Sequence, residues 1–137
     1  MSKERILIVE DDADIREGVR ILLESEDYMV DEAEDGREGL ENLRDDTDLV
    51  ILDIMMPNLD GIRATRKIRE TSSVPIIMLS AKSEDVDKIL GLNIGADDYI
   101  TKPFNPLELI ARVKSQLRRY TQLGNLATEE KEAVYVC

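Results

Sequence analysis

Acidic side chains gather where an apolar run ends near the N-terminus. The run RILIV is followed directly by Glu10, Asp11 and Asp12, and Asp14 comes two positions later. Two like charges about 4 Å apart repel each other by about 4 kcal/mol at an effective dielectric constant of 20. A bound cation would relieve this repulsion at the end of what we expect to be a buried strand.

Further polar side chains stand at the ends of later apolar runs. Asp53 ends the third run, Ser80 follows the fourth, and Lys102 follows the fifth. Sites in open α/β sheets form outside the carboxyl ends of the strands, so we expect these side chains to converge. Carboxylates are hard oxygen ligands that suit Mg²⁺. A carboxylate nucleophile, a metal, an ammonium and a hydroxyl are together the parts of a phosphoryl-transfer site.

Each of these residues has an ordinary explanation when it is taken alone. An aspartate after a strand is usually a turn or N-cap residue, and Asp12 or Asp14 could serve only as a cap for the first helix. Ser80 alone is a common loop serine, and Lys102 alone is a common surface lysine. Their joint occurrence at successive strand ends is what favours a site.

Five short apolar runs alternate with amphipathic segments along the chain. We expect strands at 5–9, 28–33, 49–54, 75–79 and 98–101, and helices at 13–26, 36–44, 61–70, 84–94 and 106–119. This alternation predicts an α/β fold, namely a doubly wound five-stranded parallel sheet of the flavodoxin-like (βα)5 kind with helices on both faces. The mixed composition of 28–33 indicates an edge strand.

Composition excludes several classes of function. The net charge of −12 makes the chain a poor ligand for nucleic-acid phosphates. The chain has no histidine, which excludes Ser-His-Asp and Cys-His catalysis and histidine zinc sites. The single cysteine, Cys137, cannot form an intrachain disulfide, which suits a reducing compartment. With no stretch typical of a signal peptide or membrane span, we expect a cytoplasmic protein without a membrane partner.

Four motifs in this order and spacing resemble the receiver domain of two-component response regulators: IVEDD, LDIMMPNLDG, MLSAK and DDYITKPF. The resemblance covers residues 3 to about 120. The segment DDYITKPFNPLELIARVKSQLRR also resembles the OmpR/PhoB-type subfamily, whose members carry a winged-helix DNA-binding domain after the receiver. We therefore expect a receiver domain at 1–120 and a linker at 121–137 toward such a C-terminal domain, which this sequence does not include.

The resemblance implies a phosphorylation site with a bound metal. Asp53 would accept a phosphoryl group from a phosphohistidine of a sensor histidine kinase, and Lys102 would contact the phosphoryl oxygens. Mg²⁺, for which Mn²⁺ can substitute, would be held by Asp11, Asp53, the backbone carbonyl of Met55 and, through a water, Glu10. The family typically has a cis peptide bond before the proline at Pro103.

The resemblance also implies how phosphorylation is transmitted. Ser80 would move to a phosphoryl oxygen, and Tyr99 would turn into the space that Ser80 leaves. The phosphorylated chain would form a homodimer and control transcription, with DNA contacted only through the C-terminal domain. Such a protein is a signalling phosphoacceptor, not an enzyme, although it assists its own Mg²⁺-dependent phosphorylation and dephosphorylation.

Helical periodicity divides two of the expected helices into an inward and an outward face. The inward residues are Val86, Leu90, Ile94, Leu109, Ile110, Val113 and Leu117. The resemblance implies that the opposite face, together with the start of the fifth strand, forms the dimer face: Lys88, Ile89, Leu92, Asp97, Asp98, Glu108, Ala111, Arg112 and Arg119. By analogy we expect ion pairs across a two-fold axis that join Lys88 to Glu108, Asp98 to Arg112 and Asp97 to Arg119.

Three other functions are weaker alternatives. An aspartyl-phosphate phosphatase of the haloacid-dehalogenase type would use Asp12 and Asp14, but Ile15 follows where a small Thr or Val is expected. A nucleotide-binding module lacks support because neither G-x-G-x-x-G nor a P-loop motif is present. A docking module that works unphosphorylated is disfavoured because the acidic residues, Ser80, Tyr99 and Lys102 are all present.

Overall fold

A computed structural model describes residues 4–54, 61–80 and 96–133 of the chain. Its elements in chain order are β1 (Arg5–Val9), α1 (Ala13–Ser25), β2 (Met29–Ala33), α2 (Gly36–Asn42), β3 (Leu49–Asp53), α3 (Gly61–Arg69), β4 (Ile76–Ser80), β5 (Asp98–Thr101) and α5 (Pro106–Ala133). The helix expected at 84–94 lies outside the described residues. Every strand lies within one residue of its expected bounds at each end, so the predicted alternation is confirmed for the described part of the chain.

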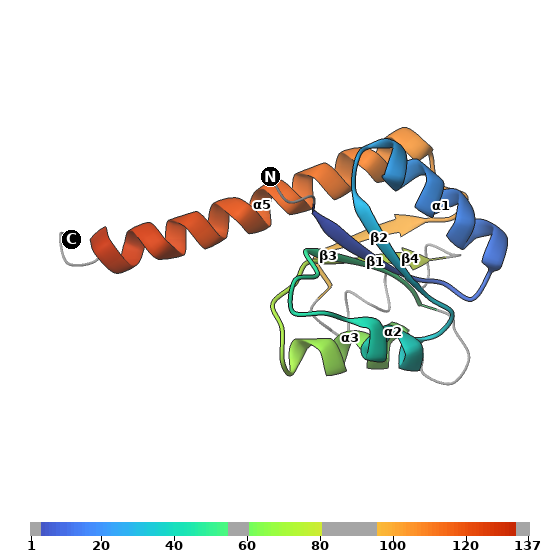
Figure 1. Cartoon of the computed structure of the whole chain (residues 1–137), viewed down its shortest axis with the longest axis horizontal. Coiled ribbons are helices and arrows are strands. Elements are labelled where there is room, and N and C mark those ends of the chain that lie inside the picture. Colours follow the sequence, from blue (N-terminus) through green and yellow to red (C-terminus); the bar gives the residue numbers. More distant parts are fainter. Residues whose placement is uncertain (1–3, 55–60, 81–95, 134–137) are drawn as a thin grey trace.

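The five strands form one parallel sheet in the order β2-β1-β3-β4-β5. The strand order therefore reverses between β1 and β3, which are hydrogen-bonded neighbours. The mixed-composition strand β2 lies at an edge, as its sequence predicts. The doubly wound α/β fold with helices on both faces is confirmed (Figure 1).

Each face of the sheet is covered by its own pair of described helices (Figure 1). On one face, Ile6, Ile8, Leu49 and Ile51 pack against α1 and α5. The other face packs against α2 and α3 through the intervening strand residues, such as Leu7 and Val50. Alternate residues of a strand point to opposite faces, and the continuous apolar sequence of β1, β3 and β4 follows from this two-sided burial.

Side-chain caps start three of the helices. Asp12 accepts hydrogen bonds from the backbone N–H groups of Asp14 and Ile15 at the start of α1. Asp35 accepts from the N–H of Glu38 at the start of α2, and Asn105 accepts from the N–H of Leu107 at the start of α5. These oxygens satisfy donors that have no partner inside the helix.

The last helix is longer than the sequence pattern suggests. We expected it to end at residue 119, but α5 continues to Ala133 and projects beyond the rest of the molecule (Figure 1). The added segment has no proline and contains several Leu, Ala and Glu residues, which favour helix. Its one glycine costs only about 1 kcal/mol relative to alanine, which is too little to stop the helix. The predicted helix end was therefore wrong, because a polar composition does not by itself end a helix.

Candidate functional site

The candidate site lies at the carboxyl end of the sheet, where β1 and β3 lie side by side. Asp53 is the last residue of β3 and Glu10 follows β1 directly. Both continue the alternation of the strand residues that face α1 and α5, so both carboxylates lie on that side of the sheet. Glu10 is completely buried and Asp53 is 5% exposed. The convergence that the sequence predicts is confirmed for these two carboxylates.

Lys102 is the cation between these two carboxylates. Its ammonium nitrogen Nζ lies 2.6 Å from Oε1 of Glu10 and 2.9 Å from Oδ2 of Asp53. The lysine follows β5 directly, and its backbone N–H donates to the carbonyl of Ser80 at the end of β4, 2.6 Å away. The peptide bond between Lys102 and Pro103 is cis, which is the isomer that the resemblance implies.

The local environment shifts the pKa values of this group. Burial and the neighbouring Asp53 carboxylate together raise the pKa of Glu10 to about 8, although the hydrogen bond from Lys102 acts to lower it. Burial lowers the pKa of Lys102, but its hydrogen bonds to Glu10 and Asp53 outweigh this effect and leave the pKa raised. In the absence of a metal, Lys102 is therefore charged at neutral pH and Glu10 favours its protonated form.

Three carboxylates at this edge could hold a metal ion. Oxygen atoms of Glu10, Asp11 and Asp53 all lie within 4.8 Å of one another. Oε2 of Glu10 is buried and has no hydrogen-bond partner among the described residues. An all-oxygen donor set with one unsatisfied buried oxygen fits a hard divalent cation such as Mg²⁺. Met55, whose carbonyl the resemblance adds to this set, lies outside the described residues.

The start of α3 packs directly against the backbone of Asp53. A Cβ atom added to Gly61 would lie 2.3 Å from the carbonyl oxygen of Asp53 and 2.7 Å from Cα of Ile54. The N–H of Gly61 donates to the carbonyl of Ile54 at 2.9 Å. Only a residue without a side chain allows this approach, so Gly61 fixes the backbone that carries Asp53.

Ser80 and Tyr99 lie on neighbouring strands on the opposite side of the sheet from Glu10. Ser80 ends β4 and is completely buried. Tyr99 of β5 is partly buried and packs against the cluster that includes Met78, its neighbour across the ladder. The two predicted switch residues therefore lie on one face of the sheet, and Ser80 contacts the site through the hydrogen bond from the Lys102 N–H to its carbonyl.

The described part of the predicted dimer face is exposed except at Asp98 and Arg112, which are partly buried, and some of its charges have partners within the chain. Arg112 lies 2.5 Å from Asp98 and 3.2 Å from Glu108. Oδ2 of Asp97 accepts from Arg69 at 2.6 Å and from the N–H of Ile76 at 2.8 Å. Ala111 and Arg119 are exposed on α5. Three further residues of this face, Lys88, Ile89 and Leu92, lie outside the described residues.

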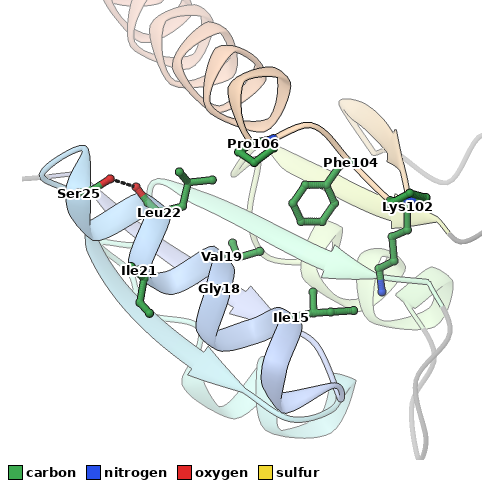
Figure 2. Close-up of a pocket in the computed structure, with 10 residues that line it drawn as sticks. Ile15, Gly18, Val19, Ile21, Leu22, Ser25, Lys102, Phe104 and Pro106 are labelled. Atoms are coloured by element: carbon green, nitrogen blue, oxygen red, sulfur yellow. Dashed lines mark hydrogen bonds between the residues drawn. The ribbon is translucent and has the colours of Figure 1, made fainter.

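An apolar groove of about 810 Å³, which the sequence pattern does not predict, opens beside Lys102. Figure 2 shows Ile15 and Leu22 of α1 on one side and Phe104 and Pro106 on the other, with the Lys102 side chain at one end. Ile21 also lines the groove and is 55% exposed. The run of three apolar residues at 21–23 was the available signal, because a helix with one buried face does not need all three.

No described helix is both long enough and apolar enough to cross a membrane.

Comparisons with known proteins agree with this geometry. The response regulator receiver domain family matches residues 6–114. The regulatory protein VanR of Enterococcus faecium is 48% identical over 132 residues, which cover 96% of this chain and 57% of the relative. The transcriptional regulatory protein ResD of Bacillus subtilis is 48% identical over 122 residues, which cover 88% of this chain and 51% of the relative. The chain thus spans about half the length of the curated relatives it matches.

Solved structures show the same fold. A response regulator receiver domain protein (CheY-like) from Methanospirillum hungatei matches with a TM-score of 0.81 at 32% identity, covering 88% of this chain and 98% of that chain. A two-component response regulator from Clostridium difficile matches with a TM-score of 0.79 at 33% identity, covering 85% of this chain and 98% of that chain.

Proposed function

This chain belongs to the response regulator receiver domain family, with relatives of the OmpR/PhoB type, and from this membership we propose that it is a signalling switch that accepts a phosphoryl group on Asp53. The observation that carries the proposal is the placement of the Lys102 ammonium between the buried carboxylates of Glu10 and Asp53. The donor is a phosphohistidine of a sensor histidine kinase, which suits a chain without histidine.

In the proposed transfer, a carboxylate oxygen of Asp53 attacks phosphorus. The new O–P bond forms as the P–N bond to the donor histidine breaks, and the imidazole leaves with the electron pair. The Lys102 ammonium already lies 2.9 Å from Asp53, so it is within reach of the oxygens of a phosphoryl group attached there. Its charge stabilises the added negative charge without a large movement. The protein assists this reaction and the later loss of phosphate, but it is a signalling protein and not a turnover enzyme.

The proposed cofactor is Mg²⁺, for which Mn²⁺ can substitute. Asp11 and Asp53 would bind it directly, Glu10 through a water, and Met55 with its backbone carbonyl. A bound divalent cation would offset the repulsion between these carboxylates and polarise the phosphoryl oxygens. The unsatisfied oxygen of Glu10 supports this assignment, because buried polar atoms without partners are rare in folded proteins.

Ser80 and Tyr99 are the proposed switch. The Ser80 hydroxyl is buried, and it would have to move to donate to a phosphoryl oxygen on Asp53. Tyr99 lies on the adjacent strand and on the same face, so it can enter the space that Ser80 leaves. Phosphorylation would thereby shift an existing equilibrium between two arrangements. If Tyr99→Ala still dimerised on phosphorylation, this coupling would be wrong.

The proposed output is a homodimer through the face that includes Asp97, Asp98, Arg112 and Arg119. Among the described residues, the two hydrogen bonds to the Asp97 carboxylate both end on its Oδ2 atom. Its Oδ1 atom is therefore the oxygen that we assign to Arg119 of a second copy. Arg112 would exchange its intrachain pair with Asp98 for the equivalent pair across the two-fold axis. Such an exchange adds little free energy by itself, so the apolar centre of the face must contribute most of it.

The apolar groove beside Lys102 is the proposed docking surface for the donor domain of the kinase. The donor histidine must come within bonding distance of Asp53, and the groove shares Lys102 with that site. Exposed apolar surface of this kind marks protein interaction sites. Ile15 and Phe104 line the groove on its two sides (Figure 2).

We also propose that residues 121–137 link the receiver at 1–120 to a C-terminal winged-helix domain, through which alone the protein would contact DNA. The chain spans about half the length of relatives such as ResD, which leaves room for such a domain. Because α5 is continuous to Ala133, the linker would begin as a helix and transmit the position of the dimer face directly.

The proposal is tested by incubating the native chain and Asp53→Asn with acetyl phosphate, with and without Mg²⁺. Intact-mass spectrometry counts the phosphoryl groups and sedimentation velocity measures dimer formation. We expect one Mg²⁺-dependent phosphoryl group and a dimer for the native chain, and neither for Asp53→Asn.

The other outcomes separate the parts of the proposal. Modification without dimer formation would support Asp53 as the phosphoacceptor and would contradict the proposed dimer face. A folded native chain that is modified neither by acetyl phosphate nor by a sensor kinase would favour the docking module that works unphosphorylated.

A further inference from the structure

The loop that carries Glu10 and Asp11 is held by an arginine of α1. Nη1 of Arg16 lies 2.7 Å from the backbone carbonyl oxygen of Glu10 and donates a hydrogen bond to it. The same guanidinium lies 3.5 Å from Oε1 of Glu32 on the edge strand β2, and the Arg16 side chain is only 15% exposed. A planar guanidinium with donors in a fixed fork can hold two acceptors at once.

The peptide group between Glu10 and Asp11 is thereby fixed. Before this peptide group, the N–H of Glu10 donates to the carbonyl of Ala33 at 3.1 Å, which continues the hydrogen bonding between β1 and β2. Within it, Arg16 holds the Glu10 carbonyl. Because the peptide unit is planar, fixing this carbonyl also fixes where the nitrogen and Cα of Asp11 lie.

Asp11 depends on this backbone support. It is exposed, unlike Glu10 and Asp53, and no hydrogen bond or ion pair of its carboxylate is found among the described residues. Its side chain therefore gains its position from the backbone before it. From these contacts we propose that Arg16 is a positioning residue that orients Asp11 for the divalent cation, and that Glu32 on β2 orients Arg16 in turn. This inference rests on the proposed metal site.

Charge alone would give Arg16 the opposite effect. A cation bound to the loop that carries Glu10 and Asp11 repels Mg²⁺, so removing it should tighten Mg²⁺ binding if electrostatics decided. Removing a group that orients a metal ligand typically weakens metal binding by about 10- to 100-fold. The sign of the change in the Mg²⁺ dissociation constant therefore separates the two roles.

Arg20 provides a matched control one helical turn along α1. It pairs with the same Glu32 at 3.7 Å and with Glu24 at 2.7 Å. No contact joins it to Glu10 among the described residues. Arg20→Met therefore removes one charge and contacts to both α1 and β2, but leaves the support of the Glu10 carbonyl in place.

The test is a calorimetric titration of Mg²⁺ into the unphosphorylated native chain, Arg16→Met, Arg16→Lys and Arg20→Met, with urea unfolding of each variant in parallel. We expect Arg16→Met to raise the Mg²⁺ dissociation constant about tenfold. Arg20→Met should stay within about twofold of the native chain, because its charge is more distant and screened. Arg16→Lys keeps the charge but not the fork, so it should also weaken binding. If Arg16→Met does not fold, Arg16→Lys serves as the test variant in its place.

Two results would count against the proposal in distinguishable ways. Native Mg²⁺ binding with unchanged or tighter binding by both Arg16 variants would overturn the positioning role and leave the metal site intact. A native chain that does not bind Mg²⁺ would overturn the metal site, and the positioning role with it.

Discussion

The Lys102 ammonium nitrogen lies 2.6 Å from a carboxylate oxygen of Glu10, a residue that is completely buried. The same ammonium lies 2.9 Å from Asp53. One cation from the end of β5 thus faces two carboxylates from the ends of β1 and β3. Because burial weakens the solvation of all three groups, the site is sensitive to any change in its charge balance.

Removing the ammonium should therefore destabilise the metal-free protein. Lys102→Met removes the cation beside the buried Asp53 carboxylate and the hydrogen-bond donor to Glu10, and we expect the free energy of unfolding to fall by roughly 3 kcal/mol. Saturating Mg²⁺ should restore part of this loss, since a divalent cation can replace the missing charge. Urea unfolding with Mg²⁺ and with a chelator measures both effects.

Lys114→Met is the control for this experiment. Lys114 pairs with Glu26 at 3.1 Å, but its side chain is 49% exposed. An exposed pair contributes about 0–1 kcal/mol, so this variant should change stability little and should not respond to Mg²⁺. Equal losses in the two variants would contradict the role given to Lys102.

The pKa of Glu10 predicts how the stability of the metal-free protein depends on pH. Its pKa is raised from 4.5 to about 8 in the folded state, because burial disfavours the charged form. A group with a raised folded pKa contributes stability that is complete below its unfolded pKa and is lost as the pH rises through its folded pKa. We expect this contribution to decline between pH 4.5 and about 8. Glu10→Gln stays neutral and should lack this pH-dependent contribution. If the free energies of unfolding of the two proteins depended on pH in the same way, the raised pKa of Glu10 would be contradicted.

Gly61 should be required for the geometry of Asp53. A Cβ atom at this position would lie 2.3 Å from the Asp53 carbonyl oxygen, so Gly61→Ala must displace either α3 or the end of β3. Overpacking of this kind costs about 1–3 kcal/mol. We also expect slower modification by acetyl phosphate, measured by intact mass at fixed times.

Gly18→Ala is the matched control, since nothing lies within 4 Å of the added Cβ atom. In the middle of α1, alanine should stabilise the helix by about 0.5–1 kcal/mol. Its rate of modification by acetyl phosphate should equal that of the native chain. A Gly61→Ala variant with the native rate would show that the displacement does not reach the Asp53 side chain.

Much of the fold could be predicted because the signals are local. The apolar runs of β1 and β3 and their acidic ends place Glu10 and Asp53 at one edge once a parallel sheet is assumed. The strand ends also predict that Lys102 converges with these acids, but they do not predict its direct contact with Glu10, because strand order does not specify the conformation of a long side chain. Arg16 gave no signal either, since its partner is a backbone carbonyl.

Two other features of the structure lie outside what the sequence pattern predicts. The exposure of Ile21 follows from the space between α1 and the β5–α5 loop, and only the assembled groove shows it. The continuation of α5 past residue 119 follows from helix propensity that outweighs a single glycine. The polar composition of this segment is therefore compatible with helix.

If the apolar groove is the docking surface, a substitution in it should affect phosphorylation by a kinase but not modification by acetyl phosphate. Ile21→Glu places a charge on an exposed groove residue, so it should leave the fold intact. We expect it to slow phosphorylation by a sensor-kinase catalytic core that modifies the native chain, by about tenfold, because one desolvated charge at an interface costs more than 1.4 kcal/mol. Modification by acetyl phosphate, which needs no docking, should be unchanged.

Met29→Glu is the control for this substitution. Met29 is 41% exposed at the start of the edge strand β2 and does not line the groove. The kinase should modify it at the native rate. If Ile21→Glu and Met29→Glu behaved alike toward the kinase, the groove would not be the docking surface.

The final prediction concerns the dimer face. It compares Arg118 and Arg119, two adjacent arginines of α5. Arg119 and Asp97 both line a small cavity, whereas Arg118 is exposed and belongs to no predicted pair. Arg119→Glu would place a carboxylate against Asp97 of a second copy, and like charges across a two-fold axis repel twice because each contact occurs twice. After modification by acetyl phosphate, we expect Arg119→Glu to sediment as a monomer at concentrations where Arg118→Glu and the native chain are dimers. Both variants carry the same net charge, so a general charge effect would weaken both dimers equally, and that result would remove Arg119 from the interface.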